Sequence, residues 1–357
     1  MGTTILVAPA AYKGSFGPRA VAEAIARGAR RACPQATVLE CPVADGGDGL
    51  LEAVLGSGSL RERVRVTGPL GNPVDAELGW VDPETAIFAS ASACGLALVP
   101  EDRRDPLRTT TRGVGELLVE AADRGATTIV VGLGGSATVD GGTGAARGVG
   151  WTFRDAGGRE LPDGGGALAE LAHADGGWGL SARVVALADV RTRLTEAAAV
   201  FGPQKGATEA QVTQLAAGLT RLADLMARYG RADLAAQPGS GAAGGLGAGL
   251  AYFAAADLVP GAAWVFDRIG FDAALAKADL VITGEGVFDE TSLLGKAPGE
   301  VVRRAQTARK KLAIVAGRAG PLIGVHMLTG EGATLDAGGI AALGERAARE
   351  AFGLPPA

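Results

Sequence analysis

Hydrophobic and polar residues follow one another along this chain with two different periods. Residues 3–9 and 36–44 are short runs rich in Val, Ile and Leu, which are typical of buried strands. Between them, residues 18–32 repeat their apolar positions at helical spacing, and Pro18 suits the first turn of a helix. This order predicts a βαβ unit, in which a right-handed crossover joins two parallel strands.

The pattern changes between residues 61 and 92. Three short alternating runs are separated by Gly-Asn-Pro and Asp-Pro, which predicts an antiparallel meander. The βαβ style returns near residue 279. The elements expected between and after these points are a helix at 113–124, a strand at 127–131, a short helix at 143–149, a hairpin at 151–160, a strand at 182–190, a long helix at 209–230, and strands at 279–286, 311–317 and 324–330.

We therefore expect an α/β protein of two domains. Residues 1–60 and 268–357 are predicted to form a Rossmann-like domain with a parallel sheet, and residues 61–267 an inserted α/β domain with a mixed sheet. The length of 357 residues suits two domains. A single large sheet is the alternative.

Composition narrows the class of protein. The net charge of −5 argues against a nucleic-acid or anionic-membrane surface, and no apolar run reaches the length of a membrane span. The three cysteines match no zinc or redox motif, and the N-terminus looks like a first strand rather than a signal peptide, so we expect free thiols in a reducing cytoplasm. With two histidines, a His-based triad or multi-histidine metal site is disfavoured. A homodimer is compatible with the sequence.

Glycine-rich turns follow several predicted strands, at residues 43–49, 132–142, 186–207 and 281–286. Glycine lets backbone N–H groups approach a ligand, and a turn between a strand and a helix directs several N–H groups at one point, which suits anions. One such turn can be purely structural. No GxxxxGK[ST] motif is present, and GLGGSA (132–137) lies too deep in the chain for a typical dinucleotide fingerprint.

The polar residues in these turns indicate phosphoryl transfer, which needs cations on the phosphates, acids on Mg²⁺ and a group that orients the acceptor. Lys13 and Lys205 lie in tight turns where an ammonium could meet a phosphate, although each could be a solvated lysine. Six acids at or after strand ends suggest one acidic cleft, although each could cap a turn. They are Asp45, Asp48, Asp140, Asp189, Glu285 and Asp289.

Roles can be assigned within this set. Asp189 lies at the end of the apolar run at 182–190. It is predicted to orient the acceptor hydroxyl and take its proton, and Asp45 is the alternative for this role. Glu285 and Asp289 lie close together in one turn region and suit a metal ion.

Taken together, the motifs PVADGGDG, GLGGSATVDGG, FGPQKGA, PGSGAAGGLGAGL and ADLVITGEG…GKAP resemble the bacterial glycerate kinase family, the type that forms 2-phosphoglycerate. The resemblance runs from residue 5 to about residue 318. It implies ATP and Mg²⁺ as cofactors, D-glycerate as a small hydroxy-acid substrate, and an active site in the cleft between two α/β domains. The residues implied for nucleotide and phosphate binding are Gly134, Gly135, Ser136, Thr138, Lys205 and Gly206, with Lys13 at the catalytic centre and Ser15 on the substrate.

The chain departs from the family pattern at several positions. The first motif usually reads Asp-Ser-Phe-Lys-Gly-Ser, whereas Ala10, Ala11 and Tyr12 precede Lys13 here. An arginine usual in the family is replaced by Val287, while Arg191 and Arg193 are gained and could hold a substrate carboxylate.

These changes leave alternatives to a glycerate kinase. One is a diverged kinase for a related hydroxy acid. Another is a non-catalytic homologue that binds a nucleotide or metabolite, and the least favoured is an NAD-dependent dehydrogenase.

Overall fold

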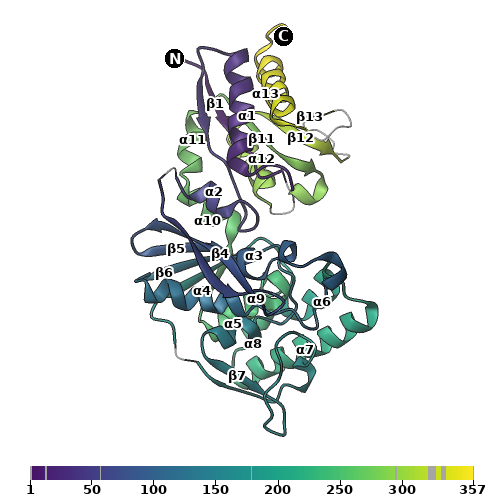
Figure 1. Ribbon diagram of the computed structural model, residues 1–357. Helices are drawn as coiled ribbons and strands as arrows, with labels where there is room; N and C mark the ends of the chain where they lie inside the picture. The colour runs from purple at the N-terminus through teal and green to yellow at the C-terminus, as the bar shows by residue number, and fades with distance from the viewer. Residues whose placement is uncertain are drawn as a thin grey trace. The chain divides into compact units, whose positions relative to one another are not determined.

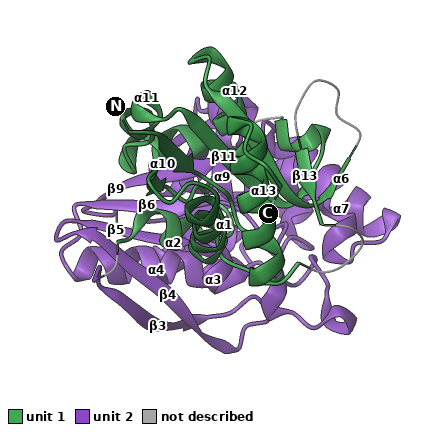
Figure 2. Ribbon diagram, turned by 90° about the horizontal axis from the view of Figure 1, so that it is seen from above, with its two compact units in different colours: residues 1–56, 262–357 green, residues 57–261 purple. Residues whose placement is uncertain are grey.

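The computed structural model describes residues 2–12, 14–56, 58–177, 179–293, 296–320, 327–330 and 335–356 (Figure 1). The chain separates into two compact units (Figure 2). Unit 1 comprises Met1–Gly56 and Ala262–Ala357, and unit 2 comprises Ser57–Gly261. Among the described helices, none is long and apolar enough to cross a membrane.

Unit 1 is built on a parallel five-stranded sheet with the order β13-β12-β11-β1-β2. Its register pairs Val7 of β1 with Ile282 of β11 and with Glu40 of β2. The strands are β1 (Thr4–Val7), β2 (Thr37–Glu40), β11 (Leu280–Phe288), β12 (Lys311–Ala319) and β13 (Met327–Thr329). Residues 324–326 of the strand expected at 324–330 lie outside the described residues.

Helices cover both faces of this sheet. The core on one face unites apolar strand residues with α1 (Pro18–Ala32), whose bounds are those predicted, and with α13 (Ala337–Phe352). Gly28 lets these two helices touch, because a Cβ there would lie 1.9 Å from the Ala341 carbonyl oxygen. The other core contains residues of α10 (Gly261–Arg268), α11 (Phe271–Lys277) and α12 (Ala297–Thr307). The remaining elements of unit 1 are α2 (Leu50–Val54) and the 3₁₀ helix η6 (Glu290–Leu293).

Unit 2 contains a mixed six-stranded sheet with the order β10-β9-β6-β5-β4-β3. The first three strands in sequence form the predicted antiparallel meander, and β5, β6, β9 and β10 run parallel to one another. The strands are β3 (Arg61–Thr67), β4 (Pro73–Asp82), β5 (Thr85–Ala89), β6 (Thr128–Gly132), β9 (Arg183–Ala188) and β10 (Asp257–Pro260). The parallel sheet of unit 1 and the mixed sheet of unit 2 confirm the predicted fold class.

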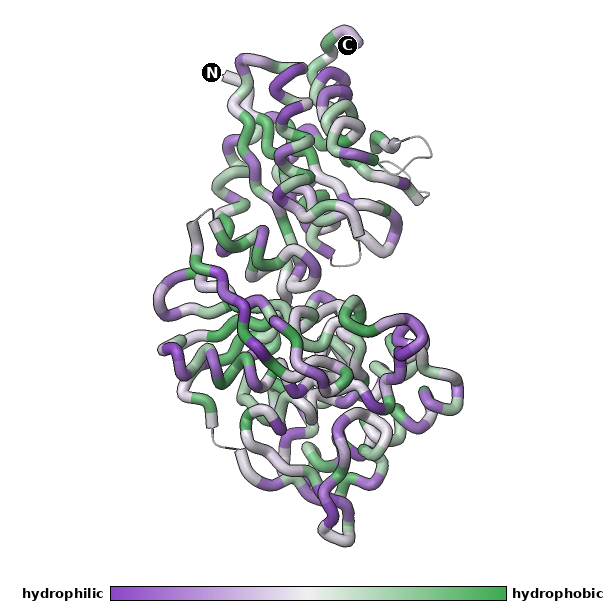
Figure 3. The backbone as a smooth tube through the Cα atoms, viewed as in Figure 1, coloured by the Kyte–Doolittle hydropathy of each residue, from purple (hydrophilic) through white to green (hydrophobic). Residues whose placement is uncertain are grey.

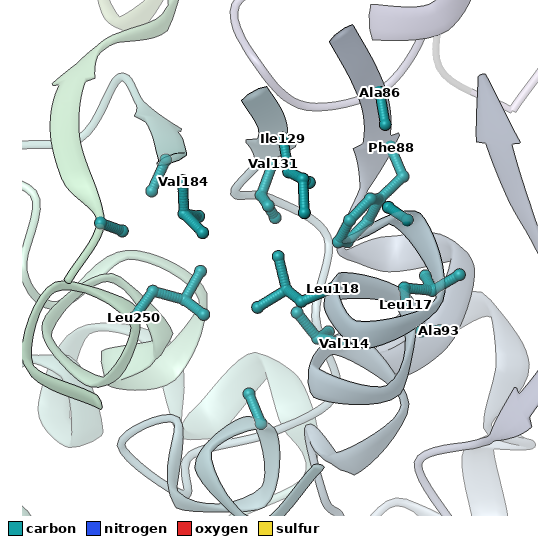
Figure 4. Close-up of a cluster of buried hydrophobic side chains, with 14 of the residues drawn as sticks. Ala86, Phe88, Ala93, Val114, Leu117, Leu118, Ile129, Val131, Val184 and Leu250 are labelled. Carbon is teal, nitrogen blue, oxygen red and sulfur yellow. The ribbon is translucent and has the colours of Figure 1, made fainter. Parts of the chain in front are cut away.

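The main core of unit 2 lies between this sheet and two helices (Figure 4). Phe88 of β5 and Val131 of β6 are fully buried against Leu118 of α4 (Arg112–Asp123), and Leu250 of α9 (Ala242–Phe253) joins them. A second core packs Leu219 and its neighbours on the long helix α7 (Glu209–Arg228). The remaining helices are α3 (Ala91–Cys94), α5 (Thr143–Gly148), α6 (Ala197–Phe201), α8 (Ala232–Ala236), η1 (Leu96–Leu98), η2 (Glu101–Arg103), η3 (Leu168–Glu170), η4 (Leu194–Glu196) and η5 (Pro203–Lys205).

The hydrophobic pattern located most of the strands but not every pairing, and it left helices such as α9 and α13 unpredicted. Figure 3 shows hydrophobic and polar stretches following one another along the chain in both units. The hairpin expected at 151–160 survives as a turn with a bridge between Arg154 and Glu160, but the ladder of β7 (Trp151–Arg154) is formed with β8 (His173–Gly176). Strand β10 was not predicted, because four residues that include one proline carry little periodicity.

Candidate active site

The candidate residues lie near or beyond the carboxyl ends of parallel strands in both units. In unit 1, β1 is flanked by β2 on one side and by β11 on the other. The strands that follow β2 in the sequence are therefore added on the opposite side of β1. Such a switch point leaves a crevice at the carboxyl ends of the strands, where ligands of open α/β sheets bind. In unit 2, the loops after β5, β6 and β9 occupy the equivalent end of their parallel strands.

Lys205 anchors the glycine-rich turn that follows β6. It ends η5 and is 3% exposed. Its Nζ donates to Ser136 Oγ at 2.9 Å and to the Thr138 carbonyl oxygen at 2.7 Å. The lysine therefore holds the turn from inside the protein and is not the solvated lysine that the sequence left as an alternative.

Burial lowers the pKa of Lys205 to about 8, against the opposing effects of Cys94 and Asp140. The side chain is thus still largely a cation at neutral pH, placed beneath the turn. Its Nζ also lies 5.8 Å from the centre of the Phe201 ring. A buried positive charge at this position favours the binding of an anion on the outer side of the turn.

This turn contains backbone donors that no described acceptor uses. Gly134 is half-buried, and Gly135 is exposed with a φ of +62°. The Gly135 carbonyl oxygen accepts from Leu96 N–H at 2.7 Å, while Ala137 N–H donates to the Cys94 carbonyl oxygen at 2.8 Å. Among the described residues, the N–H groups of Gly134, Gly135 and Ser136 have no acceptor. Successive free N–H groups form a concavity suited to phosphate.

Asp140, at the far end of the same turn, has a structural role that removes it from the predicted acidic cleft. It is fully buried, and its carboxylate accepts from the N–H groups of Thr111, Gly142 and Gly144 and from the Thr111 hydroxyl. Burial raises the pKa of Asp140, and these four hydrogen bonds counteract the rise. The carboxylate therefore fixes the turn and has no acceptor site left for a ligand.

The glycines of the 238–250 motif serve packing against this turn. A Cβ on Gly244 would lie 1.9 Å from the Thr138 carbonyl oxygen, and Gly244 has a φ of +73°. Gly249 likewise leaves room for the Gly141 carbonyl oxygen, which would lie 2.5 Å from an added Cβ. Two of the glycine-rich motifs are thus neighbours in space, and the second one supports the first.

Asp189 directly follows β9, as the sequence analysis expected, and is half-buried. Arg191 and Arg193 come next and are exposed. The Arg193 N–H donates to Glu196 Oε2 at 2.8 Å. Gly206, which follows Lys205, is exposed with a φ of +91°. These residues all belong to unit 2.

Unit 1 gathers a second cluster around Glu285 of β11. Burial raises the pKa of Glu285, and the nearby carboxylates of Asp45 and Asp289 raise it further, while the Ser292 hydroxyl and Lys296 lower it. Its Oε1 is buried and accepts no hydrogen bond from the described residues. An orphaned carboxylate oxygen beside other carboxylates fits a hard divalent cation such as Mg²⁺, which prefers oxygen ligands.

Asp289 lies one turn further on and is engaged locally. Its Oδ1 accepts from the N–H of Thr291 at 2.8 Å and from its hydroxyl at 2.6 Å, and these contacts hold the pKa of Asp289 below its usual range. Lys296 Nζ donates to the Thr291 hydroxyl at 3.1 Å. Within the described part of the chain, no group of three or more His, Cys, Asp or Glu side chains is arranged to hold a metal on its own. Mg²⁺ commonly takes one or two protein carboxylates together with substrate phosphates.

Tyr12 connects the first family motif, at residues 10–15, to the strands that carry this cluster. Its hydroxyl donates to the Val315 carbonyl oxygen at 2.8 Å, and burial, with a smaller effect of Glu285, raises its pKa. Ala10 and Ala11 are half-buried and Ser15 is exposed. Lys13, which the sequence analysis placed at the catalytic centre, lies outside the described residues.

Arg318 was missed by the sequence analysis. The register of the sheet pairs Val287 on β11 with Arg318 on β12. Val287 is 43% exposed, and Arg318 is also exposed. Among the described residues, the Arg318 side chain has no ion pair or hydrogen bond. The position where the family resemblance implied an arginine therefore has an arginine as its neighbour across the ladder, which only the pairing of the two strands reveals.

The comparisons with known proteins identify the class. A model of the glycerate kinase family matches residues 5–339, and the chain belongs to this family of kinases, which are phosphotransferases acting on an alcohol group. It is 41% identical to the glycerate 2-kinase of Escherichia coli K12 over 331 residues, which cover 90% of this chain and 87% of the relative. It is 42% identical to the glycerate kinase of Bacillus subtilis 168 over 314 residues, with coverages of 85% and 82%.

A solved structure supports the same family assignment. A crystal structure from Salmonella typhimurium LT2, assigned as a glycerate kinase 2, matches with a TM-score of 0.85 at 39% identity and covers 99% of both chains.

Proposed function

We propose that this protein transfers the terminal phosphoryl group of ATP to the 2-hydroxyl of D-glycerate, with Mg²⁺ as the required cation. The observation that carries the proposal is the Lys205-anchored turn, with its three free N–H groups, in a chain of the glycerate kinase family. The glycerate 2-kinase of E. coli supports the choice of acceptor hydroxyl.

Unit 2 supplies the groups for the phosphates and the acceptor. We assign the phosphates to the N–H groups of Gly134, Gly135 and Ser136, over the charge of Lys205. Thr138 contributes through the carbonyl that Lys205 holds, and Gly206 gives the lysine its tight turn. Asp189 orients the hydroxyl of the acceptor and takes its proton as the new P–O bond forms.

Unit 1 supplies the groups for the cation. Glu285 is the primary ligand in this proposal, because its buried Oε1 lacks a donor among the described residues, and Asp289 and Asp45 add negative charge beside it. Bound Mg²⁺ would neutralise charge on the phosphate oxygens of ATP. Lys13 is proposed to contact the transferred phosphoryl group. We propose that the clusters of both units serve this one reaction.

The carboxylate of glycerate needs a cation or hydroxyl partner. Arg191, Arg193 and Ser15 are the partners proposed from the sequence, and all three are exposed. We propose Arg318 as a further partner, because it lies on the strand next to that of Glu285 and its side chain has no partner among the described residues. An arginine at this site would bind the carboxylate in a bidentate manner.

A second candidate function follows from Ala10, Ala11 and Val287. These apolar residues stand where the family resemblance implied polar ones, which favours a related, less polar hydroxy acid as acceptor. We also propose a cytoplasmic location, supported by the three free cysteines.

The test is ADP release with D-glycerate and a panel of related hydroxy acids, coupled in parallel to an enzyme that consumes 2-phosphoglycerate only. Both signals should rise together with D-glycerate and require Mg²⁺. ADP release without consumption of the product would place the phosphoryl group on another hydroxyl. ADP release only with another acid would support the diverged kinase, and no ADP release with any acid would contradict both proposals.

A further inference from the structure

A cavity of about 450 Å³ opens in unit 2 beside the segment that supports the glycine-rich turn. It lies between Leu70 and Gly71 of the β3–β4 loop, residues 102–110 and Asp163. None of its lining residues was assigned to the active site. Its side chains are mostly charged, and their pairing decides what the cavity can bind.

Two of the lining carboxylates are satisfied within the protein. Asp163 accepts from Arg112 Nε at 3.0 Å and Nη2 at 3.1 Å, and it also pairs with Arg147 at 3.2 Å. Asp105 Oδ1 accepts from the Leu107 N–H at 3.1 Å and from Gln211 Nε2 at 3.3 Å. Asp163 is therefore neutralised by two arginines, whereas the neutral donors bound to Asp105 leave its negative charge in place.

Three lining arginines retain unused donors. Arg103 and Arg108 are exposed and have no ion pair among the described residues. Arg104 approaches Glu101 only at 3.9 Å, and that glutamate is 90% exposed. The Arg104 Nε is buried and has no acceptor among the described residues. Against these three cations stand the negative charges of Asp102 and Asp105, so the lining keeps a small surplus of positive charge.

We propose that this cavity is a binding site for a phosphate group, distinct in its residues from the Gly134–Ser136 turn. Guanidinium forks match the oxygens of phosphate, and several converging arginines are the usual solution for a doubly charged anion. The volume accommodates a phosphate together with a small organic group. The shared chemistry has two sources: a phosphate of the nucleotide substrate, or a separate phosphorylated metabolite or free phosphate.

The same segment connects the cavity to the turn. The Thr109 hydroxyl donates to the Ala137 carbonyl oxygen at 2.9 Å, and Thr111 holds Asp140 through two hydrogen bonds. Arg104 packs against Gly206, where an added Cβ would lie 2.8 Å from the Arg104 carbonyl oxygen. An anion bound by residues 103–108 therefore also stabilises the glycine-rich turn and Lys205, through these contacts.

Binding of inorganic phosphate to the full-length protein tests the proposal, by calorimetry with and without a saturating non-hydrolysable ATP analogue. The double variant Arg103→Ala/Arg108→Ala should weaken phosphate binding at the cavity at least roughly tenfold, the scale of losing charge-assisted hydrogen bonds. The matched control is Arg65→Ala, another exposed arginine of unit 2. Thermal unfolding checks that each variant is folded.

Each outcome decides the matter. Phosphate binding that survives the analogue and is lost in the double variant supports a separate phosphorylated ligand. Binding that the analogue displaces, together with weaker analogue binding by the double variant, supports a phosphate of the nucleotide. Unchanged binding of phosphate and analogue by the double variant, or equal losses in the Arg65→Ala control, would overturn the proposal. The readout is binding, so it stands apart from any failure of the kinase assay.

Discussion

The buried polar groups of the phosphate turn in unit 2 and the acidic cluster of unit 1 are held in different ways. In unit 2, Lys205 and Asp140 are buried beneath the turn, and each has several hydrogen-bond partners. In unit 1, Glu285 keeps a buried oxygen with no described partner, beside Asp45 and Asp289. A turn that binds phosphates gains from being held rigid before the ligand arrives. A carboxylate that awaits a cation keeps an acceptor unused, at a cost to stability.

The largest expected effect concerns Asp189. Asp189→Asn should keep the fold and ATP binding but lower kcat by about 10²-fold, the typical size of a general-base contribution. Single-turnover phosphoryl transfer measures it, with Asp233→Asn, an exposed acid elsewhere in unit 2, as the control. Near-normal turnover in folded Asp189→Asn protein would place the base elsewhere.

Lys205→Met should raise the KM for ATP by roughly tenfold, about 1.4 kcal/mol, because the turn loses its anchor and its charge. The pH profile gives a second readout. Burial places the pKa of Lys205 at about 8, so in the wild-type protein the KM for ATP should rise above pH 8 as the ammonium loses its proton. The stability of the wild-type protein should increase between pH about 8 and 10.5, because in this range the unfolded chain binds more protons than the folded one. A wild-type KM that is independent of pH from 7 to 9 would contradict this role.

Arg318→Ala should raise the KM for D-glycerate several-fold, up to about tenfold, while the KM for ATP stays constant. A second substitution at Val287, the residue paired with Arg318, provides a rescue experiment. Since Val287 and Arg318 are neighbours in register, Val287→Arg in the Arg318→Ala background should restore the affinity for glycerate. If Arg318→Ala leaves both KM values unchanged, the carboxylate is bound by other residues, of which Arg191 and Arg193 are the next to test.

The smallest expected effect is on stability. Burial raises the pKa of Glu285, so the folded chain binds this proton more tightly than the unfolded chain, and stability is lost as the pH rises above the ordinary range of a carboxyl group. Without Mg²⁺, Glu285→Gln should therefore melt at a higher temperature than the wild type at pH 7, and the difference should shrink as the pH falls. A lower melting temperature for the variant at pH 7 would mean that Glu285 is already well paired.

Elements set by local periodicity could be read from the sequence, whereas features set by pairing over long distances could not. The bounds of α1 and the antiparallel meander follow from hydrophobic spacing and turn residues. The partnership of β7 with β8 and the register of Val287 with Arg318 join segments that no local pattern relates.

The candidate site shows the same division. The placement of Asp189 directly after β9 could be predicted, because an acid at the end of an apolar run emerges at the strand end. The burial of Lys205 and the structural role of Asp140 could not, since both depend on contacts with other segments, such as Thr111. The catalytic and ligand-binding roles of these residues stay predictions.

The contrast between the two units is tested most directly by the affinity for a non-hydrolysable ATP analogue, measured with and without Mg²⁺ in Lys205→Met and Glu285→Gln. If unit 2 binds phosphates and unit 1 binds the cation, Lys205→Met should weaken binding under both conditions. Glu285→Gln should weaken it only when Mg²⁺ is present. Equal losses in Glu285→Gln with and without the cation, or unchanged binding by Lys205→Met, would contradict this division of roles.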